Sequence, residues 1–308
     1  MSYRARNWAE YNAGLKQQGS VTFWLDEAAL RGWNESKRSG QRGASKHYSD
    51  LAIATFETVK SVYRLAGRQT QGFIESLFGL MGVSSEVPDH STVSRRKGDL
   101  EIVLPVVPST GAIHVVIDST GIKVYGEGEW KTRQHGMSKR RTWLKLHLSV
   151  DEASGEILSA VVSGNDTHDS EVFEDLLSGF TAEVEQVSAD GAYDQLHCYD
   201  ALSEIEAKAG IPPRRNAKIQ QHGNCKGPAH LRDENLRSIR RQGRKKWKQE
   251  SNYHRRSIAE TTMYRAKAAF GGVVRSRTFE NQATELLLQC SALNRMIQLA
   301  KPESVKVA

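Results

Sequence analysis

The chain has 308 residues, 38% hydrophobic and 26% charged, so it can bury one large core or two modest ones, and global disorder is excluded. Its formal net charge of +7 suits a polyanionic partner. No apolar stretch matches a signal peptide or a membrane span, and the three cysteines form no C-x-x-C pair, so we expect a cytoplasmic chain with reduced thiols rather than a disulfide frame or a zinc site.

Residues 1–45 are polar and show little periodicity, which predicts an N-terminal arm that ends in a linker. Within the arm, the apolar run 21–25 has the composition of a segment that docks onto a folded body. Residues 36–45 are rich in Ser, Gly, Lys and Arg, as linkers are. The first folded domain is therefore expected to begin at about residue 46.

Residues 46–105 carry the pattern of three short helices. Ser49 is a candidate N-cap of the first, Gly82 a stop for the second, and Asp89 an N-cap of the third. The third helix displays three consecutive basic residues, Arg95, Arg96 and Lys97. This order fits an all-α, helix-turn-helix-like domain whose last helix contacts DNA. An ordinary bundle with a solvated basic face fits it too, and the pattern alone slightly favours that bundle.

From Gly111 onward the periodicity changes from helical to strand-like. Short apolar or alternating runs predict strands at 113–117, 142–150, 157–162, 184–189 and 210–212. Helical patterns follow 166–169 and span 196–209. This order of elements predicts the α/β class, with a mixed sheet flanked by helices.

A strongly basic segment follows at 214–248. Trp247 lies among its charged residues, which include Arg240, Arg241, Arg244, Lys245, Lys246 and Lys248. The density of positive charge favours a surface that binds DNA phosphates without reading bases, although a solvated insert has a similar composition. Two more helices are expected, over 253–270 and 279–299.

Three acids stand out for their positions. Asp118 follows the first buried run and Asp190 follows a later one, so both are expected at the carboxyl ends of strands, where open α/β sheets bind ligands. Taken singly, an Asp after a strand is usually a turn or capping residue. The two carboxylates converge only if their strands are neighbours in the sheet.

The third acid, Glu260, belongs to a spaced set. Tyr253, Arg256, Glu260 and Lys267 are separated by offsets that place all four on one stripe of a helix. An acid mixed with bases and an aromatic ring suits a site that holds both metal and phosphate. Cleavage of a phosphodiester needs an activated water and a stabilised leaving oxygen, which two divalent ions about 3.5–4 Å apart supply. Mg²⁺ fits such a site because it prefers oxygen ligands, and Mn²⁺ is expected to substitute.

These motifs together resemble the DDE transposases of bacterial insertion sequences, in particular the insertion-sequence-five family and its nine-oh-three-like group. The resemblance is carried by Ile117-Asp118-Ser119-Thr120-Gly121, by Ala189-Asp190-Gly191-Ala192-Tyr193-Asp194, and by the signature Tyr253, Arg256, Glu260 and Lys267. Segments 68–72 and 88–92 are similar to that group as well. The likeness runs from about residue 24 to 301; each motif is weak alone, and the ordered set is strong.

The resemblance implies a ribonuclease-H-like fold over 106–302, with the basic insert at about 214–250 and the helical DNA-binding domain at 46–105. It implies Asp118, Asp190 and Glu260 as the catalytic, metal-binding triad. It also implies a nucleoid-associated enzyme that binds the terminal inverted repeats of its element, cuts double-stranded DNA and joins the ends to target DNA. Work on two ends implies a homo-oligomer, at least a dimer on DNA.

Two rival functions remain open on the sequence alone. One is a ribonuclease-H-like nuclease that cuts DNA without joining it. The other is a non-enzymatic DNA-binding regulator, although clustered acids weaken DNA binding unless metal offsets them. Other acids rank below the triad because they have the pattern of turn and cap residues: Asp151, Asp166 and Asp169. Tyr253 lacks the H-x-x-R motif of a tyrosine recombinase, so a DNA contact is expected of it instead.

Overall fold

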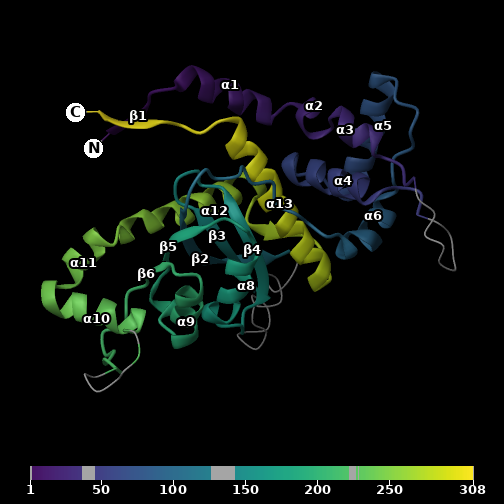
Figure 1. Cartoon of the computed structure of the whole chain (residues 1–308). Coiled ribbons are helices and arrows are strands. Elements are labelled where there is room, and N and C mark those ends of the chain that lie inside the picture. Colours follow the sequence, from purple (N-terminus) through teal and green to yellow (C-terminus); the bar gives the residue numbers. More distant parts are fainter. Residues whose placement is uncertain (1, 37–45, 126–142, 222–226, 228, 308) are drawn as a thin grey trace, which may run out of the picture. The chain divides into compact units, whose positions relative to one another are not determined.

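The computed structural model describes residues 2–36, 46–125, 143–221, 227 and 229–307. The linker expected at 36–45 lies outside the described residues except for its first position. The chain forms two compact units (Figure 1): unit 1 comprises Met1–Pro105 and Ala269–Ala308, and unit 2 comprises Val106–Ala268. No helix of the described ranges has the length and apolar character that crossing a membrane requires.

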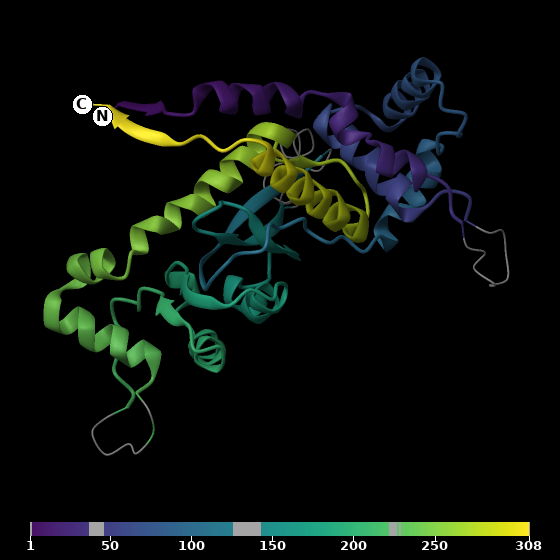
Figure 2. The same ribbon diagram turned by 45° about the horizontal axis from the view of Figure 1, so that its top comes forward.

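Unit 1 is mostly helical (Figure 2). Its first elements are β1 (Ser2–Ala5), α1 (Trp8–Gln18), α2 (Val21–Trp24), α3 (Glu27–Arg31), α4 (Asp50–Val62), α5 (Gly67–Met81), α6 (His90–Arg96) and the 3-10 helix η1 (Lys97–Asp99). Its last are β7 (Val273–Val274), α13 (Phe279–Leu299) and β8 (Ser304–Val307). Strands β1 and β8 pair antiparallel, so the two ends of the described chain lie side by side.

The N-terminal region is more ordered than an arm. Residues 8–31 form α1, α2 and α3, and the side chains of Trp24, Leu25 and Trp33 are buried. Helices α2 and α3 contact α4, while α1 contacts α13. The polar sequence showed no periodic signal for this packing, because the buried side chains are a few separate ones that include the large Trp24 and Trp33.

The expected ends of the next three helices are observed. The Ser49 side chain accepts a hydrogen bond from the Ala52 N–H at 3.0 Å and caps α4. Helix α5 ends at Gly82, whose φ of 66° is left-handed. The Asp89 side chain accepts from the Ser91 N–H at 2.8 Å and caps α6.

A buried group of charges lies inside unit 1. The Lys97 ammonium is 3.0 Å from a carboxylate oxygen of Glu57 and 3.7 Å from one of Glu285, and all three side chains are at most 6% exposed. Burial raises the pKa of Glu57, but Lys97 and Lys60 lower it by more, so the net pKa lies below its usual value. We call Glu57, Lys97 and Glu285 the Lys97 cluster.

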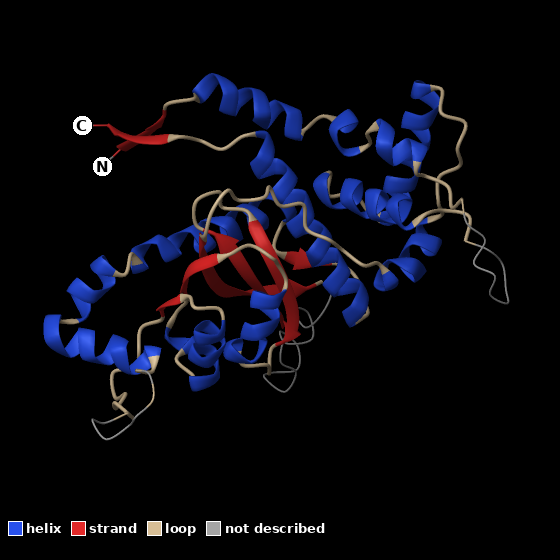
Figure 3. Ribbon diagram, viewed as in Figure 1, coloured by secondary structure: helices blue, strands red, loops and turns tan. Residues whose placement is uncertain are grey.

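Unit 2 is built on a mixed sheet (Figure 3). The strands are β2 (Ile113–Val124), β3 (Trp143–Asp151), β4 (Ile157–Gly164), β5 (Val184–Ser188) and β6 (Lys208–Gly210), in the spatial order β4-β3-β2-β5-β6. Strands β2, β3 and β4 pair antiparallel, whereas β2, β5 and β6 pair parallel. This is a ribonuclease-H-like sheet, so the predicted fold class is confirmed.

Helices flank the sheet of unit 2. They are η3 (Asp169–Val172), α8 (Phe173–Ser178), η4 (Gly191–Tyr193), α9 (Leu196–Glu204), α10 (Leu231–Gln242), α11 (Arg244–Glu250), η5 (Tyr253–Arg256) and α12 (Ser257–Phe270). On one face, Val115 and Ile117 pack with Phe173 and Tyr199 of α8 and α9 in a buried core. Asp118 lies on the opposite face, since successive side chains of a strand alternate.

Three expected boundaries were wrong. Strand β2 does not end at Asp118 but continues to Val124, because β3 pairs with it as far as Lys123. The helix expected over 196–209 ends at Glu204, where the chain turns through Glu206 at a φ of 56° and enters β6. The helix expected from 253 begins as the 3-10 turn η5, so Tyr253 precedes α12.

The predicted catalytic domain of 106–302 included the C-terminal helix. Helix α13 clusters with unit 1 rather than with the sheet. Its buried side chains include Leu286, Leu288 and Leu293, and the helix contacts α4, η1 and α1. An amphipathic pattern specifies a buried face but not the partner of that face.

Candidate active site

The register of β2 and β5 brings two of the three acids together. The parallel pairing aligns Val116 with Ser188, and Asp118 and Asp190 each lie two residues further along their chains. Asp118 lies within β2, and its side chain is 15% exposed. Asp190 begins η4, where its side chain accepts a hydrogen bond from the Ala192 N–H at 2.8 Å. Two carboxylates therefore meet beside one parallel strand pair.

The electrostatics of Asp118 reflect this pairing. Burial raises the pKa of Asp118 most, and the negative charge of Asp190 raises it further. Arg256 and the Ser119 N–H favour the ionised form, but the net pKa of Asp118 still lies above its usual value. The folded protein thus disfavours the ionised form of Asp118. A cation bound beside Asp118 would stabilise that form.

Arg256 links the third acid to the first. One guanidinium nitrogen, Nη1, donates to Oδ2 of Asp118 at 2.5 Å, and Nη2 donates to Oε1 of Glu260 at 2.6 Å. Burial lowers the pKa of Arg256, but Asp118, Tyr253, Glu260 and Asp190 raise it by more. We call Asp118, Asp190, Arg256 and Glu260 the Arg256 cluster.

The remaining members of the spaced set lie near the same face of β2. The Lys267 ammonium donates to Oγ1 of Thr120 at 2.6 Å, and Thr120 is on the same side of the strand as Asp118. The Arg256 guanidinium lies 6.0 Å from the Tyr253 ring centroid, and the Lys248 ammonium 4.7 Å. The spacing in the sequence therefore corresponds to one polar site in the structure, even though η5 interrupts the expected helical stripe.

The donor chemistry of the Arg256 cluster fits a divalent cation. Carboxylate oxygens are the ligands that Mg²⁺ prefers, and three acids here surround one positive charge. Within the described residues, however, no three His, Cys, Asp or Glu side chains are close enough to hold one metal ion. The guanidinium bonds to both Asp118 and Glu260, so it serves as the cation between them.

The basic insert forms helices α10 and α11, and its predicted phosphate contacts divide into two groups. Three have partners within the protein: Arg244 donates to the Pro213 carbonyl at 2.7 Å, Lys246 is 3.7 Å from Glu250, and Lys248 lies over Tyr253. The others are exposed, and in the part of the chain that the structure describes they have no acidic partner: Arg240, Arg241 and Lys245.

The basic residues expected at the end of the third helix are mostly engaged within unit 1. Lys97 belongs to the Lys97 cluster, and Arg96 donates to the Tyr48 carbonyl and to Asp50, each at 2.5 Å. The prediction that Arg96 and Lys97 contact DNA is therefore wrong for this conformation. Arg95 is exposed and bonds only locally, to Ser91 and Thr92.

Asp169, which the sequence ranked as a helix cap, has a different role. His168 caps η3 instead. The Asp169 carboxylate accepts from the Ser119 hydroxyl and from the Lys145 ammonium, each at 3.0 Å. It thereby braces the residue next to Asp118. No local signal in the sequence indicates this role, because Ser119 and Lys145 lie 50 and 24 residues from Asp169.

Comparison with known families identifies the kind of domain that the chain contains. Two family models, each described as a transposase DDE domain, match residues 16–127 and 109–295. A piggyBac transposase synaptic complex with hairpin DNA matches at 11% identity and a TM-score of 0.44, covering 96% of this chain and 77% of that one.

Two further structures resemble the chain more distantly. A Drosophila P element transposase strand transfer complex gives 10% identity and a TM-score of 0.30, covering 90% of this chain and 70% of that one. A simian T-cell lymphotropic virus intasome with a PP2A regulatory subunit gives 15% identity and a TM-score of 0.24, covering 63% and 66%.

Proposed function

The chain belongs to the DDE transposases, a family of enzymes that use divalent metal ions, and we propose that Asp118, Asp190 and Glu260 are its catalytic triad. The reaction we propose is cleavage of DNA at the terminal inverted repeats of an insertion sequence, followed by transfer of the freed 3′ strand to target DNA. The observation that carries this proposal is the Arg256 cluster, in which three acids from separate elements surround one cation.

The proposed metal is Mg²⁺, with Mn²⁺ able to replace it, held by carboxylate oxygens of the triad. When bound, it supplies an activated water for hydrolysis and stabilises the leaving oxygen. Arg256 must then release Asp118 and Glu260. The freed guanidinium then binds a DNA phosphate through two parallel hydrogen bonds, while the Lys267 ammonium neutralises a phosphate as a point charge.

We propose further that the α10–α11 insert is the main surface for the phosphates of double-stranded DNA. Three exposed basic side chains without an acidic partner among the described residues support this: Arg240, Arg241 and Lys245. Contacts to phosphates give affinity without sequence information. Recognition of the repeat is proposed for the helices of 46–105, with Arg95 as the remaining candidate contact. Joining two ends requires at least a dimer on DNA.

The decisive experiment is an in vitro strand-transfer assay. Labelled duplex carrying the element's terminal repeat is incubated with Mg²⁺ or Mn²⁺ and with wild type, Asp118→Ala, Asp190→Ala or Glu260→Ala. Asp175→Ala, which changes an exposed acid of α8, is the matched control. Joined product from wild type and the control alone supports the proposal.

The other outcomes separate the rivals. Cleavage without joining by wild type would indicate a nuclease. Binding without cleavage would indicate a DNA-binding regulator. Activity retained by one triad variant would remove that residue from the site.

A further inference from the structure

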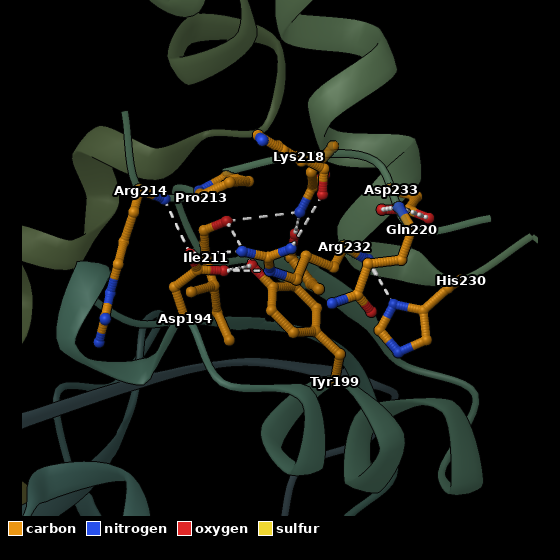
Figure 4. A network of polar contacts seen from close by, with 12 residues as sticks. Asp194, Tyr199, Ile211, Pro213, Arg214, Lys218, Gln220, His230, Arg232 and Asp233 are labelled. Carbon is orange, nitrogen blue, oxygen red and sulfur yellow. Dashed lines mark hydrogen bonds and ion pairs between the residues drawn. The ribbon is translucent and has the colours of Figure 1, made fainter. Parts of the chain in front are cut away.

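The Asp194 carboxylate, four residues after Asp190, is a buried hub of hydrogen bonds (Figure 4). Its side chain is 0% exposed and accepts from Nε and Nη2 of Arg232 at 2.7 and 3.1 Å. It also accepts from the Arg214 backbone N–H at 2.8 Å and from the Tyr199 hydroxyl at 3.1 Å. Both carboxylate oxygens are thus fully used.

These donors come from separate parts of unit 2. Tyr199 is on α9, Arg214 follows β6, and Arg232 is in the first turn of α10. Burial raises the pKa of Asp194, but the hydrogen bonds from Arg232 and Arg214 lower it by more, so its pKa lies below the usual value. A carboxylate whose ionised form is favoured therefore ties the start of the basic insert to the turn that follows Asp190.

A second acid strengthens the same junction. Asp233, next to Arg232, is buried, and its carboxylate accepts from the Gln220 and Gln221 backbone N–H groups at 2.7–3.2 Å. The Arg232 guanidinium also donates to the Lys218 carbonyl at 3.4 Å. The chain before α10 is therefore folded back onto the start of that helix.

The insert continues from this junction toward the third acid. Helix α10 leads into α11, where the Trp247 indole donates to Asn235 of α10 at 3.2 Å. Lys248 then lies over Tyr253, and η5 leads into α12, which carries Glu260. The hydrogen bonds of Asp194 therefore connect two parts of the proposed site. Asp190 lies four residues before Asp194, and the chain from Arg232 leads through α10, α11 and η5 to Glu260 on α12.

We propose that Asp194 and Arg232 are a positioning pair that fixes the basic insert against the Asp190 turn and so sets the second and third acids, and the DNA-facing side of α10, in one geometry. The proposal rests on the function proposed above for those acids. Buried ion pairs often contribute little net stability compared with apolar side chains of similar size, and in some proteins their role is to specify one arrangement, which is the role proposed for this pair. The planar fork of Arg232 provides that specificity, because it bonds both oxygens of one carboxylate.

The test uses Arg232→Met, which keeps the aliphatic length and removes the fork, and Arg232→Lys, which keeps the charge without the fork. The matched control is Asp200→Asn, which removes the charge of an exposed carboxylate 3.1 Å from His230, beside the same helix start. Hydrogen exchange of the full-length protein is followed by mass spectrometry, and strand transfer is measured as kcat and KM for DNA.

We expect Arg232→Met to speed exchange by about tenfold or more in 214–221 and 229–260 while β2, β3 and α13 keep wild-type protection. We expect kcat to fall by up to about 100-fold, since small misplacements of catalytic groups have effects of that size. The exchange rate and the kcat of Arg232→Lys should lie between those of Arg232→Met and wild type, and Asp200→Asn should match wild type in both.

Two results would overturn the proposal. One is wild-type exchange and kinetics in folded Arg232→Met. The other is a loss of protection spread evenly over unit 2, which would make the pair a general stabiliser of the fold. The exchange readout needs no catalysis, so failure of the proposed transposition chemistry in wild type would be recognised separately.

Discussion

Two clusters of this chain each place one cation between acids, and they differ in their exposure to water. The Lys97 cluster of unit 1 is sealed, with every side chain at most 6% exposed. In the Arg256 cluster of unit 2, the Glu260 side chain is 58% exposed. The same pairing of charges is therefore fixed in one unit and open to exchange in the other.

The other donors around the acids explain this difference. In the Lys97 cluster, Glu285 also accepts from the Arg275 and Ser276 backbone N–H groups, each at 3.0 Å, so its oxygens are committed to holding a turn. In the Arg256 cluster, the hydrogen bond that the structure describes for Glu260 comes from Arg256 alone. Both oxygens of Glu285 hold backbone groups, which gives this acid a structural role, whereas Glu260 is bonded in the described chain to a side chain alone and can accept a new cation.

The largest effect is expected from Asp118→Asn, which tests the open cluster. The amide cannot serve as an anionic metal ligand, so strand transfer should fall below detection in Mg²⁺ and in Mn²⁺. Stability should be unchanged or higher, because the environment already raises the pKa of Asp118 and so favours a neutral group. Gel assays and thermal unfolding measure the two effects; a large drop in Tm would make Asp118 a structural residue.

The sealed cluster should give the opposite result. Lys97→Met leaves Glu57 and Glu285 buried without their shared cation, which should cost about 3–5 kcal/mol of unfolding free energy. Urea denaturation measures this loss. Activity per folded molecule, assayed at low temperature, should be close to that of wild type. A variant that stays stable but loses DNA binding would restore Lys97 as a DNA contact.

The pH dependence of stability should differ in sign between the clusters when no metal is present. The folded state lowers the pKa of Glu57, so its contribution to stability is present above the ordinary glutamate pKa of 4.5 and is lost as pH falls through the folded pKa. The folded state raises the pKa of Asp118, so ionisation of this group destabilises the fold as pH rises above 3.8.

Glu57→Gln and Asp118→Asn separate these two contributions. Glu57→Gln should remove a loss of stability on acidification below about pH 4.5, whereas Asp118→Asn should remove a loss that appears on raising the pH. Urea midpoints measured from pH 3 to 7 give the slopes. If both substitutions changed the slope of stability against pH in the same direction relative to wild type, the two clusters would not differ in this way.

Local signals in the sequence located much of this fold. Ser49 and Asp89 cap helices through side chains whose hydrogen bonds reach only two or three residues, so local sequence suffices to find them. The alternation in 143–150 predicted β3 for the same reason. Glu260 was found because its offsets from Arg256 and Lys267 are themselves a local pattern, and Asp118 and Asp190 because each follows a short apolar run.

What the sequence could not give depends on distant partners. Lys97 reads as an exposed base, and its burial is set by Glu57 and Glu285, 40 and 188 residues away. The extension of β2 beyond Asp118 depends on β3, and the hub at Asp194 depends on Arg232, 38 residues later. Such contacts are a property of the packed chain and leave no periodic trace.

The smallest effect is expected at the surface of the insert, where helix α10 carries arginines with and without an acidic partner in the described chain. Arg241 of α10 is exposed without an acidic partner in the described chain, whereas Arg237 of the same helix is 2.5 Å from Glu234 and donates to the Gln221 carbonyl. Arg241→Gln should reduce the magnitude of the salt dependence of binding, measured as the slope of log K against log salt concentration, where K is the association constant for duplex DNA. The expected reduction is about 0.9, because one fewer counterion is released.

Arg237→Gln is the matched control and should change that slope by less, since its charge is already balanced by Glu234. Both substitutions remove one positive charge from the same helix, so a general effect of net charge would alter the two slopes equally. Equal slopes would therefore mean that α10 attracts DNA only through its overall charge, whereas a larger change for Arg241→Gln would identify the unpaired face of α10 as the one that lies on the phosphates.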